Sequence, residues 1–342
     1  FLFVQQSSFL ENNLKYRKLG KTDITISEVG FGTGGISKLM VEEDLQEQNS
    51  AIGKAIQNGI TFFDTAAAYG NGKSEENLGR ILNELSSDII IGTKIRLLPE
   101  QLEKAYSETI ESVERSLDRL KRSYIDIIQI HNFISKDRKW PVPLSISPHD
   151  IFKEQGILKA FKELRKNNKV RYFGITGLGE PKILNEIINT NEFQTIQIYY
   201  NLLNPSAGHS VNEKFSALNY NLLIQKCRKI GMGIFAIRAL ALGALTDDTN
   251  FLEGELPLLS IGSEYKMDVQ RAEKIKSILR EIDESISETS IRFILDNEAI
   301  SSVLVGFSKE HQIDEITNCS GSPKINGETR EKIKNLWDTD FQ

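Results

Sequence analysis

Short apolar runs alternate with amphipathic segments along almost the whole chain. The runs are rich in β-branched residues and apolar throughout, a pattern typical of parallel strands that are buried on both faces. Eight such runs predict strands at Val29–Gly32, Thr61–Thr65, Ile89–Lys94, Ile125–His131, Tyr172–Thr176, Thr195–Tyr199, Gly233–Ile237 and Val303–Gly306.

The segments between these runs carry apolar residues at helical spacing. They predict helices at Asp44–Asn58, from about Ser74, and at Gln101–Lys121, Gly156–Asn167, Pro181–Asn189, Asn212–Ile230, Val269–Asp283 and Glu288–Asn297. Strict alternation of strands and helices implies a parallel sheet, and eight repeats close a (β/α)8 barrel. The predicted fold class is therefore α/β, a (β/α)8 TIM barrel.

The rest of the chain is predicted to form a hairpin, loops and a tail attached to this barrel. A hairpin around Gly20-Lys21 is expected to cover its bottom. Long loops follow the fourth strand (132–150) and the seventh (242–266), at the C-terminal face where barrels keep their active sites. Since no linker or composition shift is visible, we expect a tail at 1–14 and a single barrel domain at 15–342.

Composition excludes several classes of protein. The net charge is −5 with both signs interspersed, unlike the basic face of a nucleic-acid binder, and no apolar run approaches the ~20 residues that span a bilayer. The two cysteines, Cys227 and Cys319, lie far apart and favour a reduced, cytoplasmic protein. The opening FLFVQQSSFLENN lacks Met and a basic n-region, which suggests a trimmed or incomplete N-terminus rather than a signal peptide.

The glycine-rich stretch GFGTGG, residues 30–35, invites a dinucleotide-binding Rossmann interpretation, but its context fails. That motif needs a helix at once and an acidic residue ~20 positions further on, at the end of a second strand. A loop that opens a barrel explains the glycines better, with Gly34 expected to face a cofactor.

Polar residues end three neighbouring strands. Asp64, Lys94 and His131 close the second, third and fourth strands, and Tyr69 lies in the loop after Asp64. Each alone has a structural explanation, such as a helix N-cap, an ion pair, a core histidine or a packed phenol. Since adjacent strand ends lie ~5 Å apart at one rim, the four side chains are predicted to converge.

These side chains suit carbonyl reduction. A buried ammonium at Lys94 favours the phenolate of Tyr69 and lowers its pKa from ~10, while Asp64 keeps that ammonium charged. His131 is expected to orient a bound carbonyl. Tyr69 would then donate a proton to the carbonyl oxygen while hydride reaches the carbon. No metal site is predicted.

The stretches NGITFFDTAAAYGNGKSEENLGRIL, IIIGTKI and DIIQIHNF resemble the aldo-keto reductase superfamily, from about Tyr16 to Asn318. The resemblance implies a (β/α)8 barrel that binds NADP(H), or less often NAD(H), without a Rossmann domain. It also implies a catalytic tetrad, carried by Asp64, Tyr69, Lys94 and His131.

The same resemblance assigns cofactor positions. Thr176 and Gln197 would hold the nicotinamide carboxamide, and Arg238 and Leu240 would cover the phosphates. The complete predicted cofactor set is Gly34, Asp64, Thr176, Gln197, Arg238, Leu240, Gly306, Ser308, Lys309, Gln312 and Glu315. NADP(H) is the predicted cofactor, with two departures near its 2′-phosphate and adenine. Gln312 stands where many members have Arg, and Ile316 where they have Asn.

The predicted function is reduction of aldehydes or ketones, including sugars, to alcohols, with Phe133 and Trp140 lining the pocket for this small-molecule substrate. Neither nucleic acid nor membrane is expected as a partner, and the sequence predicts no oligomeric state. Three alternatives stay open. They are a sugar dehydrogenase working oxidatively, a non-catalytic member of the fold that still binds cofactor, and an unrelated Schiff-base aldolase that uses Lys94.

Overall fold

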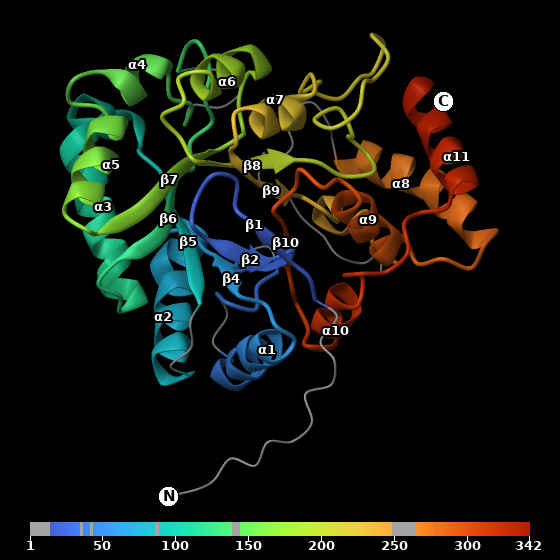
Figure 1. Cartoon of the computed structure of the whole chain (residues 1–342), viewed down its shortest axis with the longest axis horizontal. Helices are drawn as coiled ribbons and strands as arrows, with labels where there is room; N and C mark the ends of the chain where they lie inside the picture. The colour runs from blue at the N-terminus through green and yellow to red at the C-terminus, as the bar shows by residue number, and fades with distance from the viewer. Residues whose placement is uncertain (1–13, 35–36, 42–43, 86–88, 139–143, 248–264) are drawn as a thin grey trace, which may run out of the picture.

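Eight parallel strands close into a barrel at the centre of the molecule (Figure 1). The structure is a computed structural model and describes residues 14–34, 37–41, 44–85, 89–138, 144–247 and 265–342. Around the barrel the strands follow the order β10-β3-β4-β5-β6-β7-β8-β9. Their bounds are β3 (Val29–Gly32), β4 (Phe62–Asp64), β5 (Ile90–Ile95), β6 (Ile125–Ile130), β7 (Val170–Thr176), β8 (Thr195–Tyr199), β9 (Gly233–Ile237) and β10 (Ser302–Gly306). The predicted (β/α)8 barrel is confirmed.

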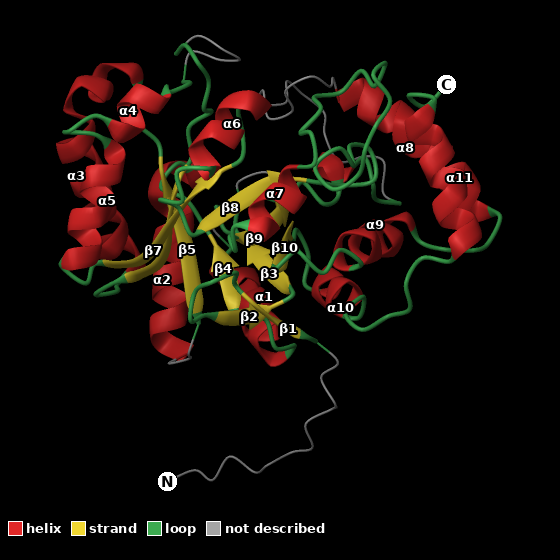
Figure 2. Cartoon of the chain, turned by 45° about the horizontal axis from the view of Figure 1, so that its top comes forward, coloured by secondary structure: helices red, strands yellow, loops and turns green. Residues whose placement is uncertain are grey.

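Helices surround these strands on the outside of the barrel (Figure 2). Their apolar faces turn inward, as in α3, where Val113, Leu117 and Leu120 are buried. The helices are α1 (Leu45–Gln57), α2 (Lys73–Leu85), α3 (Ala105–Leu120), α4 (Pro148–Phe152), α5 (Ile157–Lys166), α6 (Pro181–Ile188), α7 (Leu223–Lys229), α8 (Tyr265–Arg280), α9 (Ile286–Leu295), α10 (His311–Thr317) and α11 (Gly327–Asp338).

The predicted N-terminal hairpin forms from β1 (Tyr16–Lys18) and β2 (Thr25–Ser27). Its Leu19 and Ile26 are fully buried in a cluster with Phe62 and Phe235, at the end of the barrel opposite the carboxyl ends of the strands. Gly20 sits in the turn with φ +53°, where a Cβ would lie 2.3 Å from a neighbouring backbone nitrogen, so only glycine fits. The hairpin closes the bottom of the barrel.

The predicted helix at Asn212–Ile230 is wrong over its first half. Only α7 (Leu223–Lys229) is helical there. Asn221 and Leu222 have φ of +50° and +58°, in the left-handed region that an L-residue enters at a cost and that cannot continue a helix. Hydrogen bonds from the Asn204 amide and the Ser206 hydroxyl to the carbonyl of residue 218 hold this segment in its irregular path.

In the described part of the chain, three α-helices lie outside the predicted helix ranges. Residues 148–152, inside the predicted loop after β6, form α4, and both α10 and α11 follow β10. Most of the predicted loop after β9 falls in residues 248–264, which lie outside the described residues, as does nearly all of the predicted tail.

Candidate active site

A buried ion pair forms at the carboxyl ends of β4 and β5. Lys94 Nζ lies 2.6 Å from Asp64 Oδ2 and donates a second hydrogen bond of 2.7 Å to the carbonyl of Thr65. Burial by itself lowers the pKa of Lys94, but the negative charge of Asp64 and the nearby phenol of Tyr69 outweigh it and raise that pKa above its usual value. Lys94 is therefore an ammonium ion.

Tyr69 reaches this ion pair from the loop after β4. It begins a short 3-10 helix, Tyr69–Gly72, and its phenol oxygen accepts a 3.2 Å hydrogen bond from Lys94 Nζ. Its ring meets the His131 ring edge-on, with centroids 5.6 Å apart. Gly34 lies against the same ring, since a Cβ there would be 3.8 Å from Tyr69 Cζ. The structure brings together all four residues of the predicted tetrad.

His131 follows the last residue of β6, and its backbone N–H donates to the carbonyl of Ile95 on the neighbouring strand at 2.8 Å. His131 is 8% exposed, and its Nδ1 is buried with no hydrogen-bond partner among the described residues. Burial, followed by the positive charges of Lys94, Arg96 and Arg238, lowers the pKa of His131 well below its usual value. The imidazole is therefore neutral and keeps an unsatisfied nitrogen, unlike a histidine that serves only the core.

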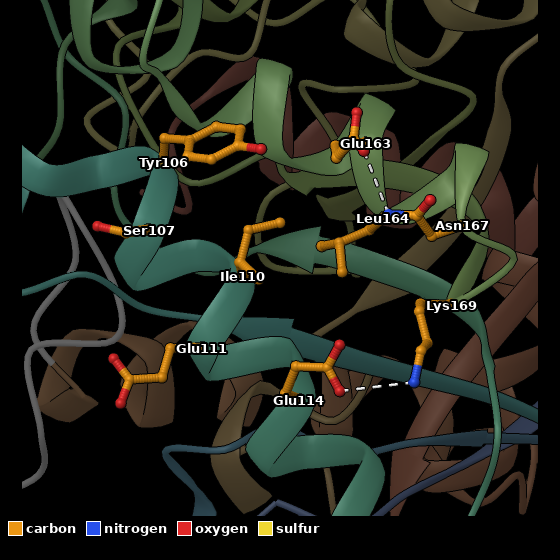
Figure 3. Close-up of a pocket in the computed structure, with 9 residues that line it drawn as sticks. All are labelled: Tyr106, Ser107, Ile110, Glu111, Glu114, Glu163, Leu164, Asn167 and Lys169. Carbon is orange, nitrogen blue, oxygen red and sulfur yellow. Dashed lines mark hydrogen bonds and ion pairs between the residues drawn. The ribbon is translucent and has the colours of Figure 1, made fainter.

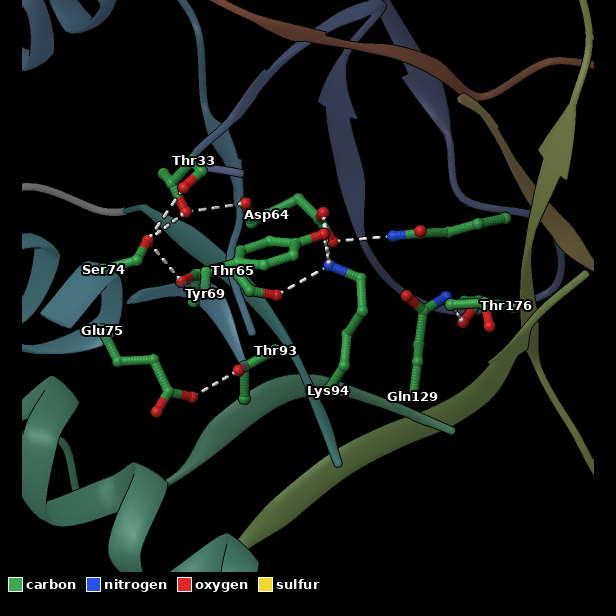
Figure 4. A network of polar contacts seen from close by, with 12 residues as sticks. Thr33, Asp64, Thr65, Tyr69, Ser74, Glu75, Thr93, Lys94, Gln129 and Thr176 are labelled. Carbon is green, nitrogen blue, oxygen red and sulfur yellow. Dashed lines mark hydrogen bonds and ion pairs between the residues drawn. The ribbon is translucent and has the colours of Figure 1, made fainter. Parts of the chain in front are cut away.

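A hydroxyl network supports the loop that carries Tyr69 (Figure 4). Ser74, in the first turn of α2, donates to the Thr33 hydroxyl at 2.7 Å, and its oxygen lies 2.9 Å from that of Thr65. The backbone N–H of Thr33 in turn donates to the carbonyl of Asp64 at 2.9 Å. Both ends of the segment between Asp64 and α2 are thereby fixed.

A second buried contact supports β5 from outside the barrel. The Thr93 hydroxyl donates to Glu75 at 2.5 Å, and Arg119 on α3 forms an ion pair of 2.6 Å with the other oxygen of Glu75. Since Thr93 precedes Lys94, this contact anchors the strand whose next side chain enters the site. No role in the site was predicted for Ser74 or Glu75; the sequence shows them only as two polar residues in the first turn of a helix.

Thr176, the last residue of β7, and Gln197, in the middle of β8, are buried neighbours in register. The Thr176 hydroxyl donates to the carbonyl of Ile130 at 3.0 Å, and Gln197 Nε2 donates to Asp64 Oδ1 at 2.7 Å. Asp64 is thus held by Lys94 on one oxygen and by Gln197 on the other. The Gln197 contact crosses the barrel, and the sequence carried no sign of it.

The end of β9 runs into a strained segment. Arg238, Ala241 and Leu242 have φ of +61°, +45° and +59°, and such strain concentrates at functional sites. The Asn201 amide holds the carbonyl of Arg238 at 2.8 Å. Arg238 Nη1 is buried and has no hydrogen-bond partner in the part of the chain that the structure describes, and burial lowers the pKa of this guanidinium. Leu240, also in this segment, is half-buried against the core.

The segment after β10 contains the predicted positions for the adenosine end of a cofactor. Gly306 is exposed at the end of the strand. Gln312 Oε1 accepts from the backbone N–H groups of Ser308 and Lys309, at 3.0 and 3.1 Å. Burial and the charge of a neighbouring glutamate raise the pKa of Glu315. In this structure Gln312 therefore occupies the backbone N–H groups of Ser308 and Lys309, two of the predicted cofactor positions.

Of the two predicted pocket residues, Phe133 is buried in the loop after β6, and Trp140 lies outside the described residues. Among the residues that the structure describes, no group of three His, Cys, Asp or Glu side chains could hold a metal ion. Within the same residues, no helix is long and apolar enough to cross a membrane.

A groove of about 680 Å³ lies between α3 and α5, on the outer helical layer (Figure 3). Ile110 and Leu164 line it with apolar surface, and an ion pair of 3.6 Å joins Glu114 to Lys169 at its edge. Because both helices lie outside the barrel, this groove has no part in the polar cluster at the strand ends.

Comparisons with known proteins give a consistent result. A family model described as "Aldo/keto reductase family" matches residues 28–338. The chain is 25% identical over 333 residues to "Uncharacterized oxidoreductase YqkF" of Bacillus subtilis (strain 168), with 94% of this chain and 95% of that one covered. It is 27% identical over 307 residues to "L-galactose dehydrogenase" of Arabidopsis thaliana, with 88% and 86% covered.

The fold also matches solved structures. The holo form of "aldo-keto reductase AKR11C1 from Bacillus halodurans" superposes with a TM-score of 0.70, at 22% identity and with 95% of this chain and 97% of that chain covered. At this identity the likeness is one of fold.

Proposed function

Since the chain belongs to the aldo/keto reductase family and is an oxidoreductase of that family, we propose that it reduces aldehydes or ketones to alcohols at the expense of NADPH. One observation carries the proposal. Lys94 Nζ lies 3.2 Å from the phenol oxygen of Tyr69 and 2.6 Å from Asp64, with the neutral His131 beside the same phenol.

The described residues fit a nicotinamide dinucleotide. Arg238 offers a buried Nη1 that no described residue binds, on a strained segment, as expected where an anionic group binds close to the backbone. We propose that Arg238 and Leu240 cover the pyrophosphate and that Thr176 and Gln197 hold the carboxamide. Gly34 would border the nicotinamide, and the 2′-phosphate and adenine would meet Gly306, Ser308, Lys309, Gln312 and Glu315. When bound, the cofactor supplies the hydride.

The chain's own residues then supply the proton and stabilise the charge that remains after its transfer. In the reduction the carbonyl carbon gains a hydride and the carbonyl oxygen gains the Tyr69 proton, so an aldehyde or ketone becomes an alcohol. The ammonium of Lys94 stabilises the phenolate that Tyr69 becomes, and Asp64 keeps that ammonium charged in its buried position. The neutral His131, whose Nδ1 no other described residue binds, orients the carbonyl.

A second candidate is oxidation of a sugar by the same groups in reverse, with Tyr69 accepting the proton. It is favoured by the similarity to "L-galactose dehydrogenase" of Arabidopsis thaliana. Rates measured with NADPH and aldehydes, and with NADP+ and aldoses, separate the two directions.

The test is the consumption of NADPH with 4-nitrobenzaldehyde, for the wild type and for Tyr69→Phe. We expect Tyr69→Phe to lose nearly all reduction while it still binds NADPH in a fluorescence titration. A variant that reduces the aldehyde at the wild-type rate would refute proton donation by Tyr69. Tighter binding of NADH than of NADPH in the same titration would refute the NADP(H) preference.

A further inference from the structure

Arg96 is held at the rim of the barrel beside His131. The carbonyl of Ile95 accepts the His131 backbone N–H at 2.8 Å. The Asn132 side chain then bonds both backbone groups of Leu97, at 3.0 and 2.8 Å. Because these bonds fix the chain on either side of Arg96, the backbone from which its side chain extends has a defined place next to the candidate active site.

The Arg96 guanidinium lacks an anionic partner in the described part of the chain. It makes no hydrogen bond or ion pair with another described residue, although it is half-buried. Burial lowers the pKa of Arg96, and the phenol of Tyr69 opposes this shift. The positive charge of Arg96 in turn adds to burial in lowering the pKa of His131. Asp64 is not available to Arg96, because its two oxygens already bind Lys94 and Gln197. A partly desolvated cation of this kind is costly unless an anion joins it.

The position of Arg96 indicates that the anion that would pair with it belongs to the substrate. Arg96 directly follows β5, whereas Arg238 directly follows β9, and β6, β7 and β8 separate these two strands around the closed barrel. The two arginines therefore leave the barrel from strands on opposite sides of it, although both charges act on His131. The proposed contacts to the cofactor phosphates follow β9 and β10 and do not include Arg96, which leaves Arg96 for the substrate.

We infer that Arg96 is a substrate-binding residue and that the site selects aldehydes or ketones that carry a carboxylate. A guanidinium matches a carboxylate with two parallel hydrogen bonds, which a neutral substrate cannot offer. The inference rests on the proposed carbonyl reduction and adds the class of substrate to it.

The test compares 4-carboxybenzaldehyde with its neutral methyl ester, methyl 4-formylbenzoate, as substrates with NADPH. The two share the aldehyde and ring and differ in charge. For the wild type we expect kcat/KM to favour the acid by roughly tenfold to a hundredfold, the range for a hydrogen bond to a charged group. Arg96→Met should abolish this preference, and Arg96→Lys should keep part of it. Arg115→Met, on the exposed face of α3, is the matched control and should keep the full preference.

Equal kcat/KM for acid and ester in the wild type, or an unchanged preference in Arg96→Met, would overturn the inference and leave the proposed function standing. If the wild type reduces neither compound nor 4-nitrobenzaldehyde, the proposed function fails. Calorimetric titration of the NADP+-saturated protein with 4-carboxybenzaldehyde then decides the role of Arg96. Weaker binding to Arg96→Met supports it, and equal binding to both proteins overturns it.

Discussion

Replacing Lys94 by Met should destabilise the protein strongly, because it removes the cation from a buried ion pair. The side chains of Lys94 and Asp64 are 0% and 6% exposed, and their charged atoms lie 2.6 Å apart. In Lys94→Met the Asp64 carboxylate stays buried, with the Gln197 amide as its remaining side-chain hydrogen-bond donor. Breaking such a pair from one side costs about 3–5 kcal/mol, because the remaining charge is uncompensated.

The second substitution Asp64→Asn should recover part of that loss. The substituted amide would still accept the Gln197 hydrogen bond on its oxygen but would carry no charge, so Lys94→Met/Asp64→Asn should be more stable than Lys94→Met alone. Lowering the pH should also recover part of the stability that Lys94→Met loses. Without Lys94, burial raises the pKa of the Asp64 carboxyl further above its usual value. A group whose pKa is raised by folding stabilises the protein fully at low pH, and this contribution is lost as the pH rises through the raised pKa. The deficit of Lys94→Met relative to the wild type should therefore shrink from about pH 7 to about pH 5.

The assay is urea unfolding followed by circular dichroism, at both pH values and for all variants. Lys162→Met serves as the control, because Lys162 forms an exposed ion pair with Glu192, which contributes less than ~1 kcal/mol. The reasoning is refuted if Lys94→Met loses no more stability than Lys162→Met. It is also refuted if the double variant is no more stable than Lys94→Met at neutral pH.

Two further predictions concern the pH dependence and the hairpin. Folding lowers the pKa of His131. The neutral imidazole therefore contributes its full share of stability above the unfolded-state pKa of ~6.5. This stability is lost as the pH falls below that value, by up to ~1.4 kcal/mol per pH unit. His131→Gln should therefore lose less stability than the wild type between about pH 7 and about pH 5 in urea unfolding, and equal losses would contradict this cause. Gly20→Ala should cost at least ~1–3 kcal/mol, because its φ is +53° and its Cβ would overlap backbone, whereas Gly327→Ala, with nothing within 4 Å, should be tolerated. Similar melting temperatures for these two variants would contradict the steric argument.

The strands and the tetrad were predictable because they depend on local patterns. A strand that is buried on both faces must be apolar along its length, so a charged residue at its end stands out, as Asp64 and Lys94 do. A parallel barrel then places consecutive strand ends side by side without further information. Strand existence and the meeting of these residues at one rim follow from the sequence by the same reasoning.

The failures share a different cause, since each depends on contacts between distant parts of the chain. The segment before α7 has the apolar spacing of a helix, but Asn204 and Ser206 bind the carbonyl of residue 218 and the backbone turns left-handed at Leu222. Similarly, Gln197 reaches Asp64 across 133 residues of sequence. Helical spacing and residue type cannot predict such contacts, because they describe only residues that are close in the sequence.

Arg96 shows the same limit at the level of function. An arginine two residues after a strand-end lysine is an ordinary feature of a sequence, since charged side chains are common where strands leave a barrel. What distinguishes Arg96 is a relation to its surroundings. It is half-buried, it lacks an anionic partner among the described residues, and its charge adds to burial in lowering the pKa of His131. The proposed chemistry uses residues that a sequence pattern can reveal, whereas the proposed choice of substrate rests on the missing anionic partner of Arg96, which only the three-dimensional structure can show.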